Sequence, residues 1–205
     1  MFVPILEQSH LICAVGRWVF EETVRTCVRL RSFYPKLYLS FNVSLQQLSD
    51  PQLIPFMKET LEKYHLPGDG VVAELTESCL DEQSDELKTY LNQCQQLGIR
   101  VALDDFGSGY SSLRMLLQYP FSIIKMDRSL IVEATESQEK TDLIDGMVYA
   151  FRQFGKKICI EGVENKCENK LAVQTGCHTI QGYYYHKPME IHDVYELFSQ
   201  SDTES

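Results

Sequence analysis

Short apolar runs alternate with longer amphipathic stretches along most of this chain. Leu11, Val15 and Trp18 recur at helical spacing, which predicts a helix over 11–32. By the same criterion, further helices are predicted over 50–64, 87–97, 137–154, 166–175 and 190–199. Apolar runs with strand propensity predict strands over 37–43, 70–75, 100–103, 122–125, 157–160 and 179–184. This alternation indicates an α/β fold with parallel strands.

About six strands, each followed by a helix or helical turn, fit most of a (β/α)₈ TIM-like barrel. The chain has 205 residues, fewer than the roughly 250 that are typical of that barrel. A doubly wound open sheet is the alternative, but no Gly-x-Gly-x-x-Gly motif follows an early strand. Residues 1–198 are predicted to form one domain, and the polar segment 199–205 a disordered tail.

Charge and cysteine content narrow the class of protein. The net charge of -10, from 19 basic and 29 acidic residues, argues against binding of long nucleic acid. A small anionic nucleotide stays possible if metal ions neutralise the contact. Seven cysteines without a Cys-x-x-Cys pair are typical of thiols in a reducing cytosol and make zinc unlikely. The sequence has no apolar run of membrane-helix length and no signal peptide, so a cytoplasmic protein is expected.

Polar side chains follow nearly every predicted strand. In chain order they are Asn42, Glu74, Asp104 with Asp105, Lys125 with Asp127, Glu161, and Gln181 at the last strand. Each has an ordinary explanation, because a lone carboxylate at a strand end is more often a helix cap than a ligand. In a parallel barrel, however, all these ends lie on one rim. The joint pattern therefore favours a functional site.

The acidic pair Asp104–Asp105 is the most informative part of that pattern. Adjacent carboxylates at the end of a buried strand are costly unless a cation offsets them, and Gly107 and Gly109 allow a tight turn behind them. One amide and several carboxylates suit Mg²⁺ or Mn²⁺. Two such cations suit phosphodiester hydrolysis by an activated water, and a lysine nearby can orient that water or stabilise phosphoryl charge.

These residues lie in motifs that resemble the EAL-domain family of cyclic di-GMP phosphodiesterases. The matching motifs, in order, are Phe-Val-Pro-Ile-Leu-Glu, Gly-Arg-Trp-Val, Asn-Val-Ser, Glu-Leu-Thr-Glu, Asp-Asp-Phe-Gly, Lys-Met-Asp, Glu-Gly-Val-Glu, Gln-Gly-Tyr and Lys-Pro. They extend from the first residues to about Met189. The resemblance implies hydrolysis of cyclic di-GMP to linear pGpG, and a homodimer formed through the segment 106–117.

The resemblance also implies a role for each site residue. One metal would be held by Asn42, Glu74 and Asp104, and the second by Asp104, Asp105 and Glu161. Lys125 would lie beside the hydrolytic water and form the catalytic group with Glu161 and Asp105. Glu77 would anchor the loop after Asp105. Substrate binding would involve Asp127, Glu164 and Gln181.

Two features depart from the family pattern. Ser108 stands where threonine is usual, which keeps the hydroxyl. The Glu-Ala-Leu motif that names the family is absent, and with it the first two barrel strands, one metal-ligand glutamate and a substrate arginine. We therefore expect an incomplete barrel with a weakened first metal site. The alternative function is a catalytically impaired EAL domain that acts as a cyclic di-GMP receptor or as a dimerisation module.

Overall fold

A computed structural model describes residues 3–9, 11–76, 79, 85–109, 116 and 119–201 of the chain. These residues fall into two compact units. Unit 1 comprises 1–75, 83–101 and 189–205, and unit 2 comprises 76–82 and 102–188. The predicted loop anchor Glu77 and much of the predicted dimer segment 106–117 lie outside the described residues.

The described strands are parallel, and their order in the sheet follows their order in the chain. This confirms the predicted α/β class and its resemblance to a TIM barrel, of which the chain forms a part. The strands are β1 (Leu39–Asn42), β2 (Val71–Thr76), β3 (Arg100–Phe106), β4 (Ile123–Met126), β5 (Lys157–Ile160) and β6 (Thr179–Ile180).

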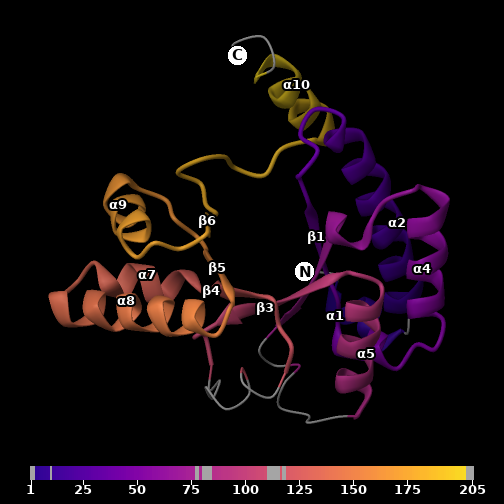
Figure 1. Cartoon of the computed structure of the whole chain (residues 1–205), viewed down its shortest axis with the longest axis horizontal. Coiled ribbons are helices and arrows are strands. Elements are labelled where there is room, and N and C mark those ends of the chain that lie inside the picture. The colour runs from indigo at the N-terminus through magenta and orange to yellow at the C-terminus, as the bar shows by residue number, and fades with distance from the viewer. Residues whose placement is uncertain are drawn as a thin grey trace. The chain divides into compact units, whose positions relative to one another are not determined.

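Unit 1 packs α2 against β1 (Figure 1). Phe20 is fully buried, and its ring meets that of Phe41 at 5.0 Å between centroids, which fixes α2 on β1. Burial of such apolar faces is the main force that holds the helices to the strands. The helices are α1 (Val3–Gln8), α2 (Leu11–Arg31), α3 (Leu45–Leu48), α4 (Leu53–Lys63), α5 (Asp85–Gln96), α10 (Ile191–Ser201) and the 3₁₀ turn η1 (Gly68–Gly70).

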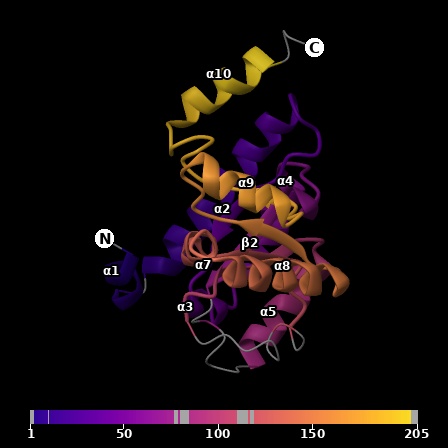
Figure 2. The same cartoon turned by 90° about the vertical axis from the view of Figure 1, so that its left-hand side faces the viewer.

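In unit 2, α8 packs on β5 and α9 packs on β6, and α7 contacts both of these helices (Figure 2). Every residue of β4 is buried, as expected for a parallel strand covered on both faces. Phe106 meets Phe151 of α8 edge to face at 5.3 Å between ring centroids. The helices are α7 (Arg128–Ala134), α8 (Gln138–Gln153) and α9 (Lys166–Gln174).

The structure corrects several predicted boundaries. Strand β3 continues through the acidic pair to Phe106 instead of ending before it. Strand β6 ends at Ile180, not near 184, because Tyr184 and Tyr185 donate their N–H groups to Val163 and Gly182 in a turn. The predicted tail begins at 199, yet α10 continues to Ser201. The short helices α1, α3 and α7 offer too few apolar repeats for a periodicity signal.

Candidate functional site

A bulge in β3 brings the two adjacent aspartates of the chain to one site. Leu103 pairs with Ile124 and Phe106 pairs with Met126, so β3 carries one residue more than β4 over this interval. Asp105 has a φ of 56°, a left-handed conformation that aspartate tolerates better than most residues. In a regular strand the two carboxylates would point to opposite faces. The bulge removes that alternation.

Asp104, Asp105 and Glu161 form the acidic cluster of unit 2. Each offers a carboxylate oxygen, and these oxygens all lie within 4.8 Å of one another. Lys125 Nζ lies 2.7 Å from Asp104 Oδ1 and 2.9 Å from Glu161 Oε1. The Lys125 side chain is only 9% exposed. Strands β3, β4 and β5 therefore bring these four charged groups together, as their positions at strand ends predicted.

Burial controls the protonation chemistry of the cluster. It is the largest cause that raises the pKa of Glu161 to about 7, against the opposing effect of the Lys125 ammonium. Cys159 pairs in register with Lys125, and burial raises the pKa of its thiol to about 11. The thiol is therefore protonated near neutral pH and is no nucleophile. The group suited to accept a proton near neutral pH is the Glu161 carboxylate.

The donor set fits a hard divalent cation. Three carboxylate oxygens at this spacing match the oxygen ligands that Mg²⁺ and Mn²⁺ prefer. Lys125 contacts two of the three carboxylates, so its single positive charge only partly offsets their negative charge. The net charge of the acidic cluster therefore still favours a bound cation.

Asn42 and Glu74 lie side by side in unit 1. They are register partners, with Asn42 at the end of β1 and Glu74 two residues before the end of β2, so their side chains lie on the same face of the strand pair. Glu74 is 8% exposed, whereas Asn42 is exposed. An amide and a buried carboxylate are oxygen donors of the kind that hard divalent cations prefer.

The three residues predicted to bind substrate have different surroundings. Asp127 caps α7, because its Oδ1 accepts from the Ser129 N–H at 2.9 Å. Glu164 forms an ion pair with Arg128, whose Nη2 lies 2.6 Å from Glu164 Oε2. Gln181 has an exposed side chain, while its backbone N–H donates to the Ile160 carbonyl at 2.9 Å.

Arg128, the partner of Glu164, was not among the residues predicted from the sequence. A signal was present in the spacing, because Arg128 follows Lys125 by three residues just as Glu164 follows Glu161. The equal spacing repeats a cation–carboxylate pair between the β4–α7 segment and the loop after β5. The pairing of Arg128 with Glu164 follows from this spacing only because β4 and β5 are neighbours in the sheet.

Residues 1–188 match the model of the EAL domain family. The chain belongs to that family. It is 33% identical over 192 residues to the signaling protein YkoW of Bacillus subtilis, covering 92% of this chain and 24% of the relative. It is 32% identical over 188 residues to the cyclic di-GMP phosphodiesterase PdeR of Escherichia coli, covering 92% of this chain and 28% of the relative. The EAL chain thus spans about a quarter of these curated relatives.

A solved structure of a MucR phosphodiesterase in complex with c-di-GMP has the same fold. The TM-score is 0.85 at 29% sequence identity, over 94% of this chain and 78% of that one. This similarity confirms the barrel-type architecture of the EAL chain. Among the described residues, none of the helices has the length and apolar character required to span a membrane.

Proposed function

We propose that this EAL domain hydrolyses cyclic di-GMP to linear pGpG with a divalent metal, in bacterial second-messenger signalling. The observation that carries the proposal is the contact of Lys125 with Asp104 and Glu161, next to the Asp105 carboxylate. Relatives named as cyclic di-GMP phosphodiesterases and the c-di-GMP complex of MucR support the choice of substrate.

In this proposal the acidic cluster holds Mg²⁺ or Mn²⁺, and Asn42 with Glu74 contributes to a second metal site. A bound cation of this kind lowers the pKa of water and polarises a phosphoryl oxygen. The residues supply the negative charge and the geometry that keep such a cation in place.

The protein groups then have distinct tasks. Lys125 Nζ is a donor that can orient the attacking water or stabilise charge on a phosphoryl oxygen. Glu161, in contact with Lys125, would accept the proton of that water. Gln181 offers an exposed amide to the substrate. A homodimer through 106–117 and a cytoplasmic location, consistent with the free cysteines, complete the proposal.

The test is turnover of cyclic di-GMP by the purified chain with Mn²⁺, followed as pGpG by chromatography. Asp105→Asn and Glu161→Gln keep volume but lose charge, and asparagine tolerates the left-handed conformation at 105. We expect each to lower turnover by at least about 100-fold with unchanged unfolding. Lys140→Gln, an exposed charge change on α8, is the control and should be neutral.

Two outcomes would contradict the proposal. Full turnover by either variant would exclude the acidic cluster as the reaction centre. Binding of cyclic di-GMP by the wild type without any pGpG would favour the receptor alternative instead. EDTA should abolish turnover, since the carboxylates then lack the cation that joins them to the phosphate.

A further inference from the structure

Two ion pairs of the same kind join β4 and the start of α7 to the loop after β5. The inner pair, Lys125 with Glu161, lies inside the acidic cluster, and the outer pair, Arg128 with Glu164, lies three residues further along both segments. Both pairs span the same 36 residues of sequence. The inner pair is nearly buried, whereas the outer side chains are 45% and 37% exposed.

The outer pair has two hydrogen bonds, whereas many surface salt bridges have one. Both guanidinium nitrogens Nη1 and Nη2 reach the two oxygens of Glu164, which is the bidentate geometry that fixes orientation. The carboxylate of Glu164 is the main cause that raises the pKa of Arg128. Isolated exposed pairs contribute little to stability. The bidentate geometry therefore suits this pair to orienting the loop after β5.

The stem of Arg128 also packs directly on the loop after β5. A Cβ added to Gly162 would lie 2.5 to 2.8 Å from three stem carbons of Arg128. Gly162 has a φ of 67°, so glycine satisfies both the close contact and the left-handed turn. Arg128 thus contacts the residue next to Glu161.

Contacts from α9 and from the residue after β6 hold the C-terminal part of the loop after β5. Glu168 is 6% exposed, and its Oε2 accepts from the Glu164 N–H at 2.7 Å. Its Oε1 accepts from Asn165 Nδ2 at 2.6 Å. The Val163 N–H donates to the Gln181 carbonyl at 3.1 Å. The loop after β5 is therefore held by α9 and by the residue after β6, and Arg128 at the start of α7 adds a further contact.

We propose that Arg128 is a positioning residue that holds Glu161 at Lys125 and Asp104 by clamping Gly162 and Glu164. In this view Glu164 serves through Arg128 and does not contact the substrate. The consequence for turnover rests on the proposed phosphodiester hydrolysis, whereas the consequences for loop order and for metal affinity do not depend on the substrate.

The primary test is hydrogen exchange of the backbone amides of 161–165 in the metal-free chain. Arg128→Gln and Glu164→Gln each remove one side of the outer pair, and we expect roughly tenfold faster exchange in this segment for both. The double variant should exchange no faster than either single variant, since both remove one contact. Unchanged exchange in Arg128→Gln would overturn the proposal.

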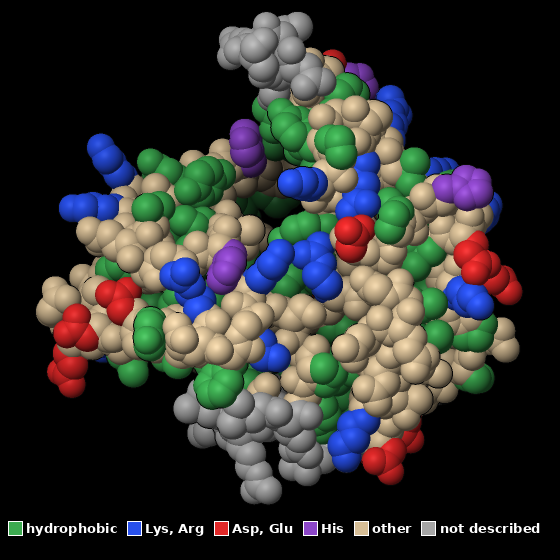
Figure 3. Space-filling view, in the orientation of Figure 1, with side chains coloured by type: hydrophobic (Ala, Val, Ile, Leu, Met, Phe, Trp, Pro, Cys, Tyr) green, Lys and Arg blue, Asp and Glu red, His purple; other side chains and the backbone are tan. Residues whose placement is uncertain are grey.

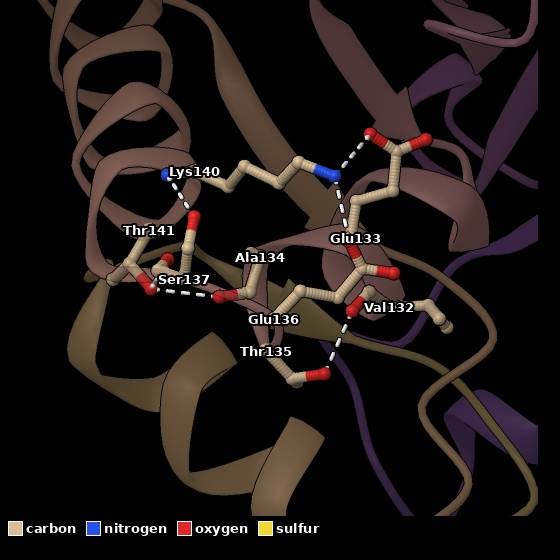
Figure 4. Close-up of polar contacts among 8 residues, drawn as sticks. All are labelled: Val132, Glu133, Ala134, Thr135, Glu136, Ser137, Lys140 and Thr141. Atoms are coloured by element: carbon tan, nitrogen blue, oxygen red, sulfur yellow. Dashed lines mark hydrogen bonds and ion pairs between the residues drawn. The ribbon is translucent and has the colours of Figure 1, made fainter.

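Lys140→Gln is the matched control because Lys140 is also a paired, partly exposed cation of unit 2. Its Nζ lies 2.6 Å from Glu136 and 3.7 Å from Glu133 where α7 passes into α8 (Figure 4). Acidic side chains gather on this surface (Figure 3). Its side chain is 43% exposed, close to the 45% of Arg128. We expect normal exchange of 161–165 in this variant.

Metal affinity and kinetics give the second readout. Mn²⁺ binding, measured by electron paramagnetic resonance without nucleotide, should weaken about tenfold in Arg128→Gln and Glu164→Gln. With cyclic di-GMP, kcat should fall while KM changes little. A raised KM in Glu164→Gln alone, with normal Mn²⁺ affinity, would identify Glu164 as a substrate contact and overturn the inference. An inactive wild type would contradict only the proposed function, because the exchange result stands without turnover.

Discussion

The side chain of His178 takes the place of a backbone carbonyl next to the β5–β6 pairing. The ring Nδ1 of His178 accepts from the Ile158 N–H at 3.0 Å, while the backbone N–H of His178 donates to the Ile158 carbonyl at 2.9 Å. Only a neutral imidazole has the lone pair that accepts this bond. Burial, followed by the charges of Arg152 and Lys157, accordingly lowers the pKa of His178 from 6.5.

Stability should therefore depend on pH through this histidine. Because the pKa is lower in the folded chain, its contribution is fully present above about pH 6.5 and is lost as the pH falls below that value. His178→Asn keeps an acceptor without a titration, so urea unfolding should show a flatter loss of stability between about pH 7 and 5. An unchanged pH profile in this variant would contradict the role of His178.

Two glycines of unit 2 should respond to alanine in opposite directions. A Cβ at Gly182 would lie 2.0 Å from the Val163 carbonyl oxygen and 2.4 Å from its nitrogen, so Gly182→Ala should cost about 2 kcal/mol or more. Gly146 lies exposed in α8 with nothing within 4 Å of an added Cβ. Gly146→Ala should stabilise by about 0.5–1 kcal/mol. Denaturant unfolding of both variants measures the two effects, and equal signs would refute the packing argument.

At the scale of elements, the acidic cluster depends on three neighbouring strand ends. Strand β3 supplies Asp104 and Asp105 through its bulge, β4 supplies Lys125, and the residue after β5 supplies Glu161. Parallel neighbours in register place these ends together, with the Glu161 N–H bonded to the Met126 carbonyl at 3.1 Å. The cluster is therefore a property of strand pairing and needs no long loop to assemble.

Without Lys125, the stability of the folded chain should depend more strongly on bound metal. Lys125→Met leaves the Asp104 and Glu161 carboxylates facing each other in a largely buried site, which should cost about 3 kcal/mol without metal. Mn²⁺ can replace the lost positive charge. Thermal unfolding should therefore show a larger rise in Tm with Mn²⁺ for this variant than for the wild type. Lys140→Met is the control, and the same Mn²⁺ response in all three proteins would refute the argument.

At the scale of the whole molecule, charge limits what the domain can bind unaided. The net charge of -10 repels an anionic dinucleotide, and Lys125 is already engaged by carboxylates. A divalent cation in the acidic cluster would neutralise the local negative charge where a phosphate must approach. The chain also spans about a quarter of its first curated relatives. What the remaining parts of such proteins do lies outside the chemistry of this site.

Much of the fold and of the site composition follows from local patterns in the sequence. The strands and long helices were predictable because apolar periodicity reports burial, and the acidic pair was visible because buried carboxylates need a cation. The short helices were not predictable. The predicted length of β6 was too great, because the contact of Gly182 with Val163, which follows the end of the strand, forms only in the folded chain.

Tertiary structure decided how those residues are used. Asp127 and Glu164 were predicted to bind substrate, and the structure adds that Asp127 caps α7 and that Glu164 pairs with Arg128. The convergence of Asp104 and Asp105 depends on the bulge in β3. Sequence patterns report burial and local propensity, which act along the chain. The partner of each polar group depends on strand register and loop contacts, which exist only once distant segments have packed together.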